Sequence, residues 1–157
     1  MIITHASAAD LDGILALEQN GFDPAEQWSH ALWADEIAAP DHLVLTNSDA
    51  DGQLQGVATF TVAEDMADLQ RVVVHPRARG RGVGSSLVRA GLEWAEALGA
   101  NRMLLEVRTD NLAAVALYRR LGFDQISCRR DYYGPGRDAY VMLRPLGEDE
   151  DVWALSR

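Results

Sequence analysis

The chain has 157 residues, of which 48% are hydrophobic and 24% charged, as in an ordinary globular domain. No run approaches the roughly 20 apolar residues of a membrane span, and no basic segment followed by an apolar run opens the chain, so neither a membrane protein nor a secretory signal is predicted. Cys128 is the only cysteine and the four histidines are scattered. We therefore expect no disulfide, no metal site and a reducing, cytoplasmic compartment.

Charge is distributed unevenly along the chain. All 14 cationic side chains are arginines, and the first of them is Arg71. Residues 1–70 carry 13 Asp and Glu and no cation, whereas residues 71–144 carry 13 Arg and 7 acids. A net charge of −10 disfavours nucleic acid as a partner. The basic middle section could nevertheless hold a small anion. A codon bias towards arginine would explain the missing lysines, although not the late first arginine.

The spacing of apolar residues, and the glycines and prolines that interrupt it, predict the helices and strands before residue 75. A turn is expected at 47–52, and the last two strands of this part are expected to form a hairpin. The predicted strands and helices are strand 2–6, helix 10–20, helix 28–38, and strands 42–46, 54–63 and 68–74.

Helices and strands alternate after a glycine-rich loop at 79–84. They are helix 85–98, strand 102–107, helix 111–121, and strands 123–130 and 137–144. The residues expected on one face of the first of these helices are Leu87, Gly91, Trp94 or Ala95, and Leu98. The order βααβββαβαββ predicts a mixed α/β fold with helical crossovers. We expect one domain at 1–144 and an acidic tail at 145–157.

The glycine-rich loop is the first candidate binding site. Glycines there allow positive φ and close approach of a ligand to the backbone, and the following helix N-terminus suits a pyrophosphate. A P-loop is excluded because the chain has no lysine, and a dinucleotide loop is disfavoured because Ser85 stands where the third glycine would be. The alternative is a tight turn with solvated arginines at Arg77, Arg79, Arg81 and Arg89.

Five motifs in order resemble the GNAT superfamily of N-acetyltransferases. They are Val72-Val73-Val74-His75-Pro76, Arg79-x-x-Gly82-x-Gly84, Leu105-Glu106-Val107-Arg108-x-x-Asn111, Ala116-Leu117-Tyr118, and Leu121-Gly122-Phe123. The segment Arg129-Arg130-x-Tyr132-Tyr133, with Asp138-Ala139 and Met142, is similar to the ribosomal-protein-alanine N-acetyltransferase branch, as is Trp28-Ser29. The resemblance is dense over residues 68–143 and weak over the first 60.

This resemblance implies the GNAT fold, a central mixed sheet of about seven strands flanked by about four helices, and acetyl-CoA as co-substrate. It also implies that a backbone N–H of strand 72–74 faces the thioester carbonyl. The residues expected to bind acetyl-CoA are Val72, Val73, Val74, Arg79, Gly80, Arg81, Gly82, Val83, Gly84, Ser85 and Asn111. Asn111 is also well placed to cap its helix, and the two roles are compatible.

Glu106 and Tyr118 are the catalytic candidates. In strand 102–107 the side chains alternate, so Glu106 interrupts an apolar strand and either pairs with an arginine such as Arg108 or Arg71 or takes part in chemistry. Tyr118 lies on the apolar face of helix 111–121 and could simply be a core residue. The resemblance implies that Glu106 is the proton acceptor and Tyr118 the proton donor.

The expected reaction is direct attack of an amine on the thioester, with a base, an oxyanion-stabilising N–H and an acid. Cys128 is a poor candidate for a covalent nucleophile, because no histidine is near it in sequence and its strand suggests a buried structural thiol.

The acceptor expected from the resemblance is the N-terminal amine of a protein, with a ribosomal protein as one candidate. Trp28, Tyr132 and Tyr133 could line a peptide groove or could be ordinary aromatic packing. Two other functions stay open: acetylation of a small amine or lysine side chain, and a CoA-binding module without turnover. The acids of residues 1–70 could favour basic peptides or could be solvated surface charges.

Overall fold

The computed structural model describes residues 2–147, which form two compact units between which the chain passes three times. Of the described residues, the first unit holds 2–61 and 69–91, and the second holds 62–68 and 92–147. Seven strands of the described part form one sheet in the order β1-β2-β3-β4-β5-β7-β6. Strand β4 (Met66–Val74) contributes to both units, since the division falls between its residues 68 and 69.

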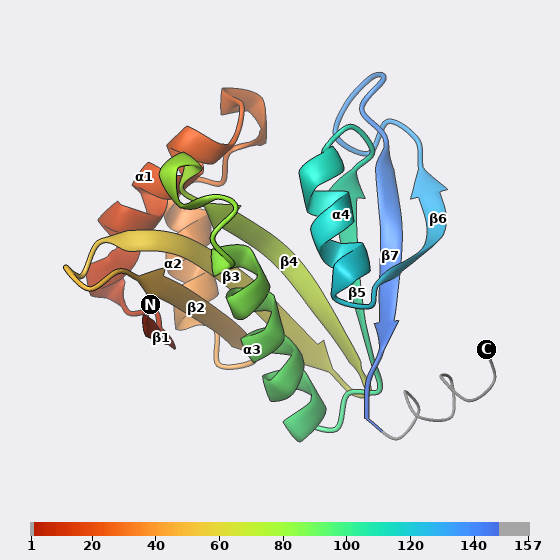
Figure 1. Cartoon of the computed structure of the whole chain (residues 1–157), viewed down its shortest axis with the longest axis horizontal. Helices are drawn as coiled ribbons and strands as arrows, with labels where there is room; N and C mark the ends of the chain where they lie inside the picture. The colour runs from red at the N-terminus through yellow and green to blue at the C-terminus, as the bar shows by residue number, and fades with distance from the viewer. Residues whose placement is uncertain (1, 148–157) are drawn as a thin grey trace. The chain divides into compact units, whose positions relative to one another are not determined.

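The first unit packs two helices against antiparallel strands. Its elements, which Figure 1 labels, are β1 (Ile2–His5), η1 (Ala8–Asp10), α1 (Leu11–Gly21), η2 (Pro24–Glu26), α2 (His30–Ala38), β2 (His42–Ser48), most of β3 (Leu54–Ala63), the end of β4, η3 (Pro76–Ala78) and the start of α3 (Val83–Ala97). Its core joins the helices to the strands through Ile14, Leu17, Trp33, Val44, Val57 and Val73. Ser29 caps α2 by accepting a hydrogen bond from the N–H of Leu32 at 3.1 Å.

Two glycines let α3 approach β3 closely within the first unit. A Cβ on Gly91 would overlap carbon atoms of the Phe60 ring, and a Cβ on Gly56 would lie 2.8 Å from Val83 Cγ1. Larger side chains at either position would push the helix away from the strand. This close packing fixes the N-terminal end of α3, where the predicted binding loop enters the helix.

The second unit is built around β5 (Arg102–Arg108), α4 (Leu112–Arg120), β6 (Asp124–Arg129) and β7 (Ala139–Pro145). Strand β5 is parallel to β4 over residues 66–68 and antiparallel to β7, and β7 in turn pairs with the edge strand β6. Figure 1 draws α4 over β5, and Arg144 Nε of β7 donates to the carbonyl of Leu121, directly after α4, at 2.8 Å. Met103, Leu105 and Val107 form the buried face of β5, as alternation predicts.

The observed order of helices and strands confirms the predicted βααβββαβαββ pattern. The predicted turn at 47–52 is shorter, because β2 continues to Ser48. Leu98 was expected on the buried face of the third helix and is 57% exposed, because α3 ends at Ala97 and Gly99 follows with φ of +90°. Of the predicted tail, Pro145 ends β7 and Leu146 is buried, whereas residues 148–157 lie outside the described residues.

Candidate functional site

The glycine-rich loop forms an open entrance to α3 in the first unit. Gly80 and Gly82 have φ of +76° and +81°, and a Cβ added to either would meet no atom within 4 Å. The N–H of Ser86 donates to the carbonyl of Gly82 at 3.0 Å, which begins the helical hydrogen bonding. The preceding N–H groups of the first turn have no acceptor within the helix and can serve an anion.

Arginines and small residues surround this helix entrance. Arg79 and Arg81 are exposed, and Arg79 Nε lies 3.4 Å from the carbonyl of Val74 at the end of β4. Val83 and Gly84 are buried as the first residues of α3, and Ser85 is partly exposed. On β4, Val73 is buried in the core, while Val72 and Val74, on the opposite face, are partly exposed. The open space and positive charge fit a pyrophosphate such as that of acetyl-CoA.

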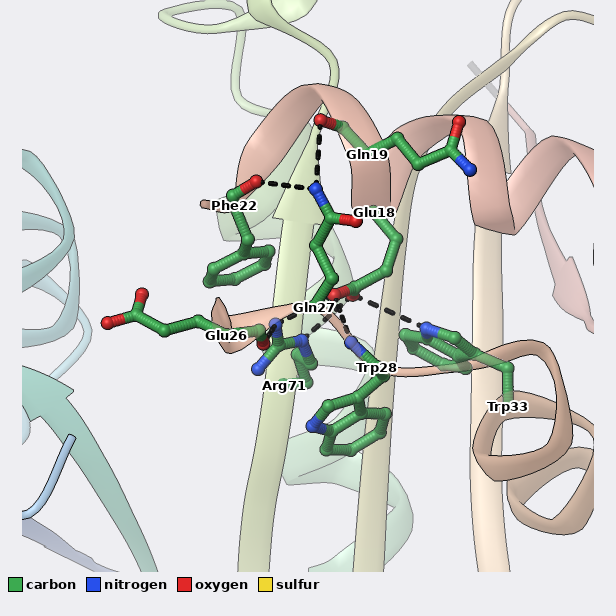
Figure 2. Close-up of polar contacts among 8 residues, drawn as sticks. All are labelled: Glu18, Gln19, Phe22, Glu26, Gln27, Trp28, Trp33 and Arg71. Carbon is green, nitrogen blue, oxygen red and sulfur yellow. Dashed lines mark hydrogen bonds and ion pairs between the residues drawn. The ribbon is translucent and has the colours of Figure 1, made fainter. Parts of the chain in front are cut away.

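Trp28 lies in the α1–α2 connection of the first unit and belongs to a cluster of charged and aromatic side chains (Figure 2). Its backbone N–H donates to Glu18 Oε2 at 2.8 Å. The centroid of its ring lies 5.0 Å from that of Trp33 and 4.9 Å from the Arg71 guanidinium carbon. Trp28 is partly exposed. The ring is therefore held in place from behind and still has surface available.

Glu106 lies on the face of β5 that α4 leaves uncovered. Arg144 pairs with Met103 across β5 and β7, and its Nε donates to the carbonyl of Leu121 at the end of α4, so the Met103 face is the one that α4 covers. Glu106 points the other way because side chains alternate along a strand. Its side chain is 34% exposed, so this carboxylate is open to reaction partners.

The partner of Glu106 is Arg129 of β6, with Nη1 and Oε1 3.5 Å apart. Pairing with an arginine was one of the two alternatives expected for Glu106, and Arg129 meets it. The two arginines given as examples have other partners, since Arg108 pairs with Asp110 at 2.8 Å and Arg71 with Glu18. Arg129 also lies over the Tyr132 ring, 4.6 Å from its centroid. Sequence reasoning missed Arg129 in this role, since only the register of β6, β7 and β5 brings it near Glu106.

Tyr118 is buried on α4, with its ring 6.0 Å from that of Phe123 in an edge-to-face contact. Burial, with a smaller electrostatic contribution from Tyr133, raises the pKa of the Tyr118 phenol well above its usual range. The hydroxyl therefore keeps its proton at neutral pH, which is the form that a proton donor requires. Within the second unit, the structure brings Tyr118 near Tyr133 and Glu106 near Arg129.

The turn between β6 and β7 carries the other two predicted acceptor residues. Tyr132 and Tyr133 pack edge to face, with ring centroids 4.9 Å apart, and Tyr132 is 44% exposed. The Tyr133 N–H donates to the carbonyl of Arg137 and closes the turn. An exposed aromatic side chain on a closed turn is suited to contact a peptide.

Asn111 caps α4 by accepting a hydrogen bond from the N–H of Ala114 at 3.2 Å, as its position predicts. Asn111 is exposed, so the cap leaves part of the side chain accessible. The interpretation of Cys128 as a buried thiol is wrong. All six residues of β6 are exposed, because this strand lies at the sheet edge and pairs only with β7.

Among residues 2–147, no three His, Cys, Asp or Glu side chains are grouped in a way that could hold a metal ion. In the same part of the chain, no helix combines the length and apolar character of a membrane span.

Comparison with known proteins adds independent information. The chain matches the Acetyltransferase (GNAT) family over residues 11–123. It is 36% identical over 148 residues to the [ribosomal protein bS18]-alanine N-acetyltransferase of Salmonella typhimurium, covering 92% of this chain and 97% of that protein. It is also 36% identical over 149 residues to an uncharacterized protein of Mycobacterium leprae, covering 92% of this chain and only 40% of that longer protein.

A solved structure agrees with these sequence relationships. The crystal structure of the ribosomal-protein-S18-alanine N-acetyltransferase from Escherichia coli superimposes with a TM-score of 0.83 at 30% identity, covering 94% of this chain and 97% of the other. The predicted fold, a mixed sheet of seven strands with four α-helices, is confirmed.

Proposed function

Because the chain belongs to the GNAT family of acetyltransferases, whose acyl donor is acetyl-CoA, we propose that it acetylates the N-terminal α-amine of a protein. Its similarity to enzymes named for the alanine of ribosomal protein bS18 makes a ribosomal protein with a small first residue the leading acceptor. The exposed free thiol of Cys128 fits the reducing cytoplasm in which such an acceptor is made.

The proposed chemistry depends mainly on the environment of the Glu106 carboxylate. It is a third exposed on the face of β5 opposite to α4, and its ion pair with Arg129 is long at 3.5 Å. A carboxylate with so few partners can accept a proton from an amine, directly or through water. A carboxylate required only for folding would be expected to have more hydrogen bonds and less exposure.

In the proposed reaction the acceptor nitrogen forms a bond to the acetyl carbon, and the bond from that carbon to the CoA sulfur breaks. Glu106 takes the proton that the amine loses, and Tyr118 supplies a proton to the departing thiolate. A backbone N–H of residues 72–74 stabilises the oxyanion. We assign the pyrophosphate to Arg79, Arg81 and the N–H groups from Gly82 to Ser85 at the start of α3.

The α-amine is also the easier acceptor on energetic grounds. At pH 7, deprotonating an α-amine costs about 1 kcal/mol and deprotonating a lysine about 4.6 kcal/mol. A single carboxylate is adequate for the first and less suited to the second. Trp28, Tyr132 and Tyr133 are the side chains that we propose as contacts of the acceptor peptide.

The test is to incubate the protein with acetyl-CoA and each of three acceptors. Release of the CoA thiol is monitored with a colorimetric thiol reagent, and the acetylated position is located by mass spectrometry. The acceptors are a peptide beginning with Ala, the same peptide blocked at its N-terminus with a free lysine, and a set of small amines. We expect turnover of the first. Turnover of only the second or third would replace this proposal with a lysine or small-amine enzyme, and binding of acetyl-CoA without turnover of any would indicate a non-catalytic module.

A further inference from the structure

Glu18 is the most completely satisfied carboxylate of the first unit. Its side chain is only 1% exposed, although it is charged. It accepts four hydrogen bonds, from Arg71 Nε and Nη2, from the N–H of Trp28, all at 2.8 Å, and from Trp33 Nε1 at 3.3 Å. Figure 2 shows these donors converging on Glu18 from β4, from the α1–α2 connection and from α2.

Arg71 extends this cluster to the chain between the two helices. Its guanidinium carbon lies 3.6 Å from the Phe22 ring centroid and 4.9 Å from that of Trp28, and Figure 2 shows it between the two rings. Besides its two bonds to Glu18, Arg71 Nη2 donates to the carbonyl of Glu26 at 2.8 Å. A single pair of charges therefore contacts both ends of the segment 22–28.

Two of these contacts end on main-chain atoms, the carbonyl of Glu26 and the N–H of Trp28. Gln27 completes the arrangement by donating to the carbonyl of Phe22 at 2.8 Å. The Glu18–Arg71 pair thus fixes the backbone conformation of the segment 22–28 as well as the position of its side chains. A buried salt bridge adds little net stability compared with apolar side chains of similar size. We therefore expect the pair to matter for where it holds the chain more than for the free energy of unfolding.

We propose that the Glu18–Arg71 pair is a positioning device for acceptor binding, which holds the segment 22–28 and the Trp28 ring where a peptide contacts them. This inference rests on the proposed function, because it assigns the acceptor to Trp28. Arg71 directly precedes Val72 in β4, the strand assigned to the thioester. The strand that holds one substrate would thereby also fix the loop that holds the other.

The decisive variant is Glu18→Leu/Arg71→Met, which removes both charges together and leaves neither buried without its partner. Such replacements are often neutral for folding. We expect this variant to stay folded and to keep its KM for acetyl-CoA, while kcat/KM for the Ala peptide falls roughly ten- to a hundredfold, mainly through KM. Amide hydrogen exchange at Trp28 should accelerate, because its acceptor is gone.

Arg71→Lys provides the conservative rescue. A lysine keeps the charge and loses the bidentate geometry, so its peptide KM should fall between those of the wild type and the double variant. The matched control is Glu36→Leu/His42→Leu. Glu36 is the other buried glutamate of this unit, bonded to His42 Nδ1 and Thr59 Oγ1 at 2.7 Å, and none of its contacts reaches residues 22–28. Peptide KM should not change in that control.

The outcomes separate the two proposals. If the wild-type protein acetylates none of the peptides, the proposed function fails before any variant is compared. If it does acetylate them and the double variant keeps an unchanged peptide KM, the positioning role is overturned. Should the double variant fail to fold, Arg71→Lys decides in its place, and an unchanged peptide KM there overturns the inference equally.

Discussion

Each unit contains an arginine–glutamate pair, and the two pairs differ in almost every physical respect. In the first unit, Glu18 and Arg71 have side chains 1% and 12% exposed and meet at 2.8 Å through two parallel bonds. In the second unit, Glu106 and Arg129 are 34% and 55% exposed and meet at 3.5 Å through one. The first carboxylate has four donors, whereas the second has one among the described residues.

This difference indicates what each carboxylate can do. A carboxylate that already accepts four hydrogen bonds in a buried site has little capacity to take up a substrate proton, but it can hold the surrounding chain. A carboxylate with one weak partner and an open face can accept a proton at little cost to the fold. The same two residue types therefore serve geometry in one unit and, as we propose, chemistry in the other.

The largest expected effect is on turnover and belongs to the open pair. Glu106→Gln should lower kcat on an N-terminal peptide by about 10²–10⁴, the usual range for loss of one general base. Acetyl-CoA binding and the midpoint of thermal unfolding should change little. The matched control is Glu93→Gln, an exposed glutamate of α3. Full turnover by Glu106→Gln would remove the basis for calling the open pair catalytic.

The two arginines allow the same substitution to be made in both pairs. Arg71→Met should lower the free energy of unfolding by about 3–5 kcal/mol, because it leaves Glu18 buried without its partner. Arg129→Met should lower it by less than about 1 kcal/mol, because that pair is exposed. Urea unfolding of both variants provides the measurement. Equal losses would show that burial does not distinguish the pairs.

The binding loop of the first unit can be tested with two glycines in nearly identical conformations. Gly82 and Gly52 have φ of +81° and +82°, and a Cβ at either meets nothing within 4 Å, so valine should strain both backbones similarly. At 100 times its Kd, acetyl-CoA should stabilise the wild type and Gly52→Val by about 2.7 kcal/mol and Gly82→Val hardly at all. An equal thermal shift in both variants would exclude this loop as the site.

Tyr118 predicts a smaller effect that appears at alkaline pH. Its pKa is raised in the folded state, so its contribution to stability is complete below the usual tyrosine pKa of about 10 and is lost as pH rises further. Unfolding by urea between pH 9 and 11 should show a decline of up to about 1.4 kcal/mol per pH unit from this residue, absent in Tyr118→Phe. Tyr132→Phe, at an exposed tyrosine, should follow the wild type. Parallel curves for Tyr118→Phe and the wild type would contradict the assignment.

The smallest expected effect concerns the acids of residues 1–70. Asp23 and Glu26 lie in the segment assigned to the acceptor, so we expect severalfold higher kcat/KM for a peptide continuing with Arg and Lys than for one continuing with Asp and Glu. Both peptides share their first four residues. The advantage should shrink as salt shortens the Debye length from about 10 Å at 0.1 M. Equal rates at low salt would assign these acids to solvation alone.

The sequence predicts local features of this molecule better than distant ones. The order of elements follows from periodicity and glycine stops, and the Asn111 cap depends only on residues three apart. An arginine partner for Glu106 was foreseen as an alternative, but not which arginine, because Arg129 is 23 residues away and reaches Glu106 only through strand register. The Glu18–Arg71 pair spans 53 residues. The one sign of this pair in the sequence was Glu18 itself, a glutamate on the apolar face of the predicted helix 10–20.

The misplacement of Cys128 has a similar cause. A short strand such as DQISCR, with only Ile126 and Cys128 apolar, can be central or at an edge of a sheet, and periodicity alone does not distinguish the two positions. Burial of Cys128 would have required another layer over β6, whereas all six residues of that strand are exposed. The site residues were predicted by family resemblance more than by pattern, because Glu106 and Tyr118 each have an ordinary structural explanation.

The exposed position of Cys128 also makes the protein convenient for spectroscopy. The natural chain offers one thiol, on a β-strand and accessible to solvent, so a maleimide dye or nitroxide would attach at one position of the second unit without any substitution. A change in the signal of such a label on adding acetyl-CoA or peptide would report on the surroundings of β6.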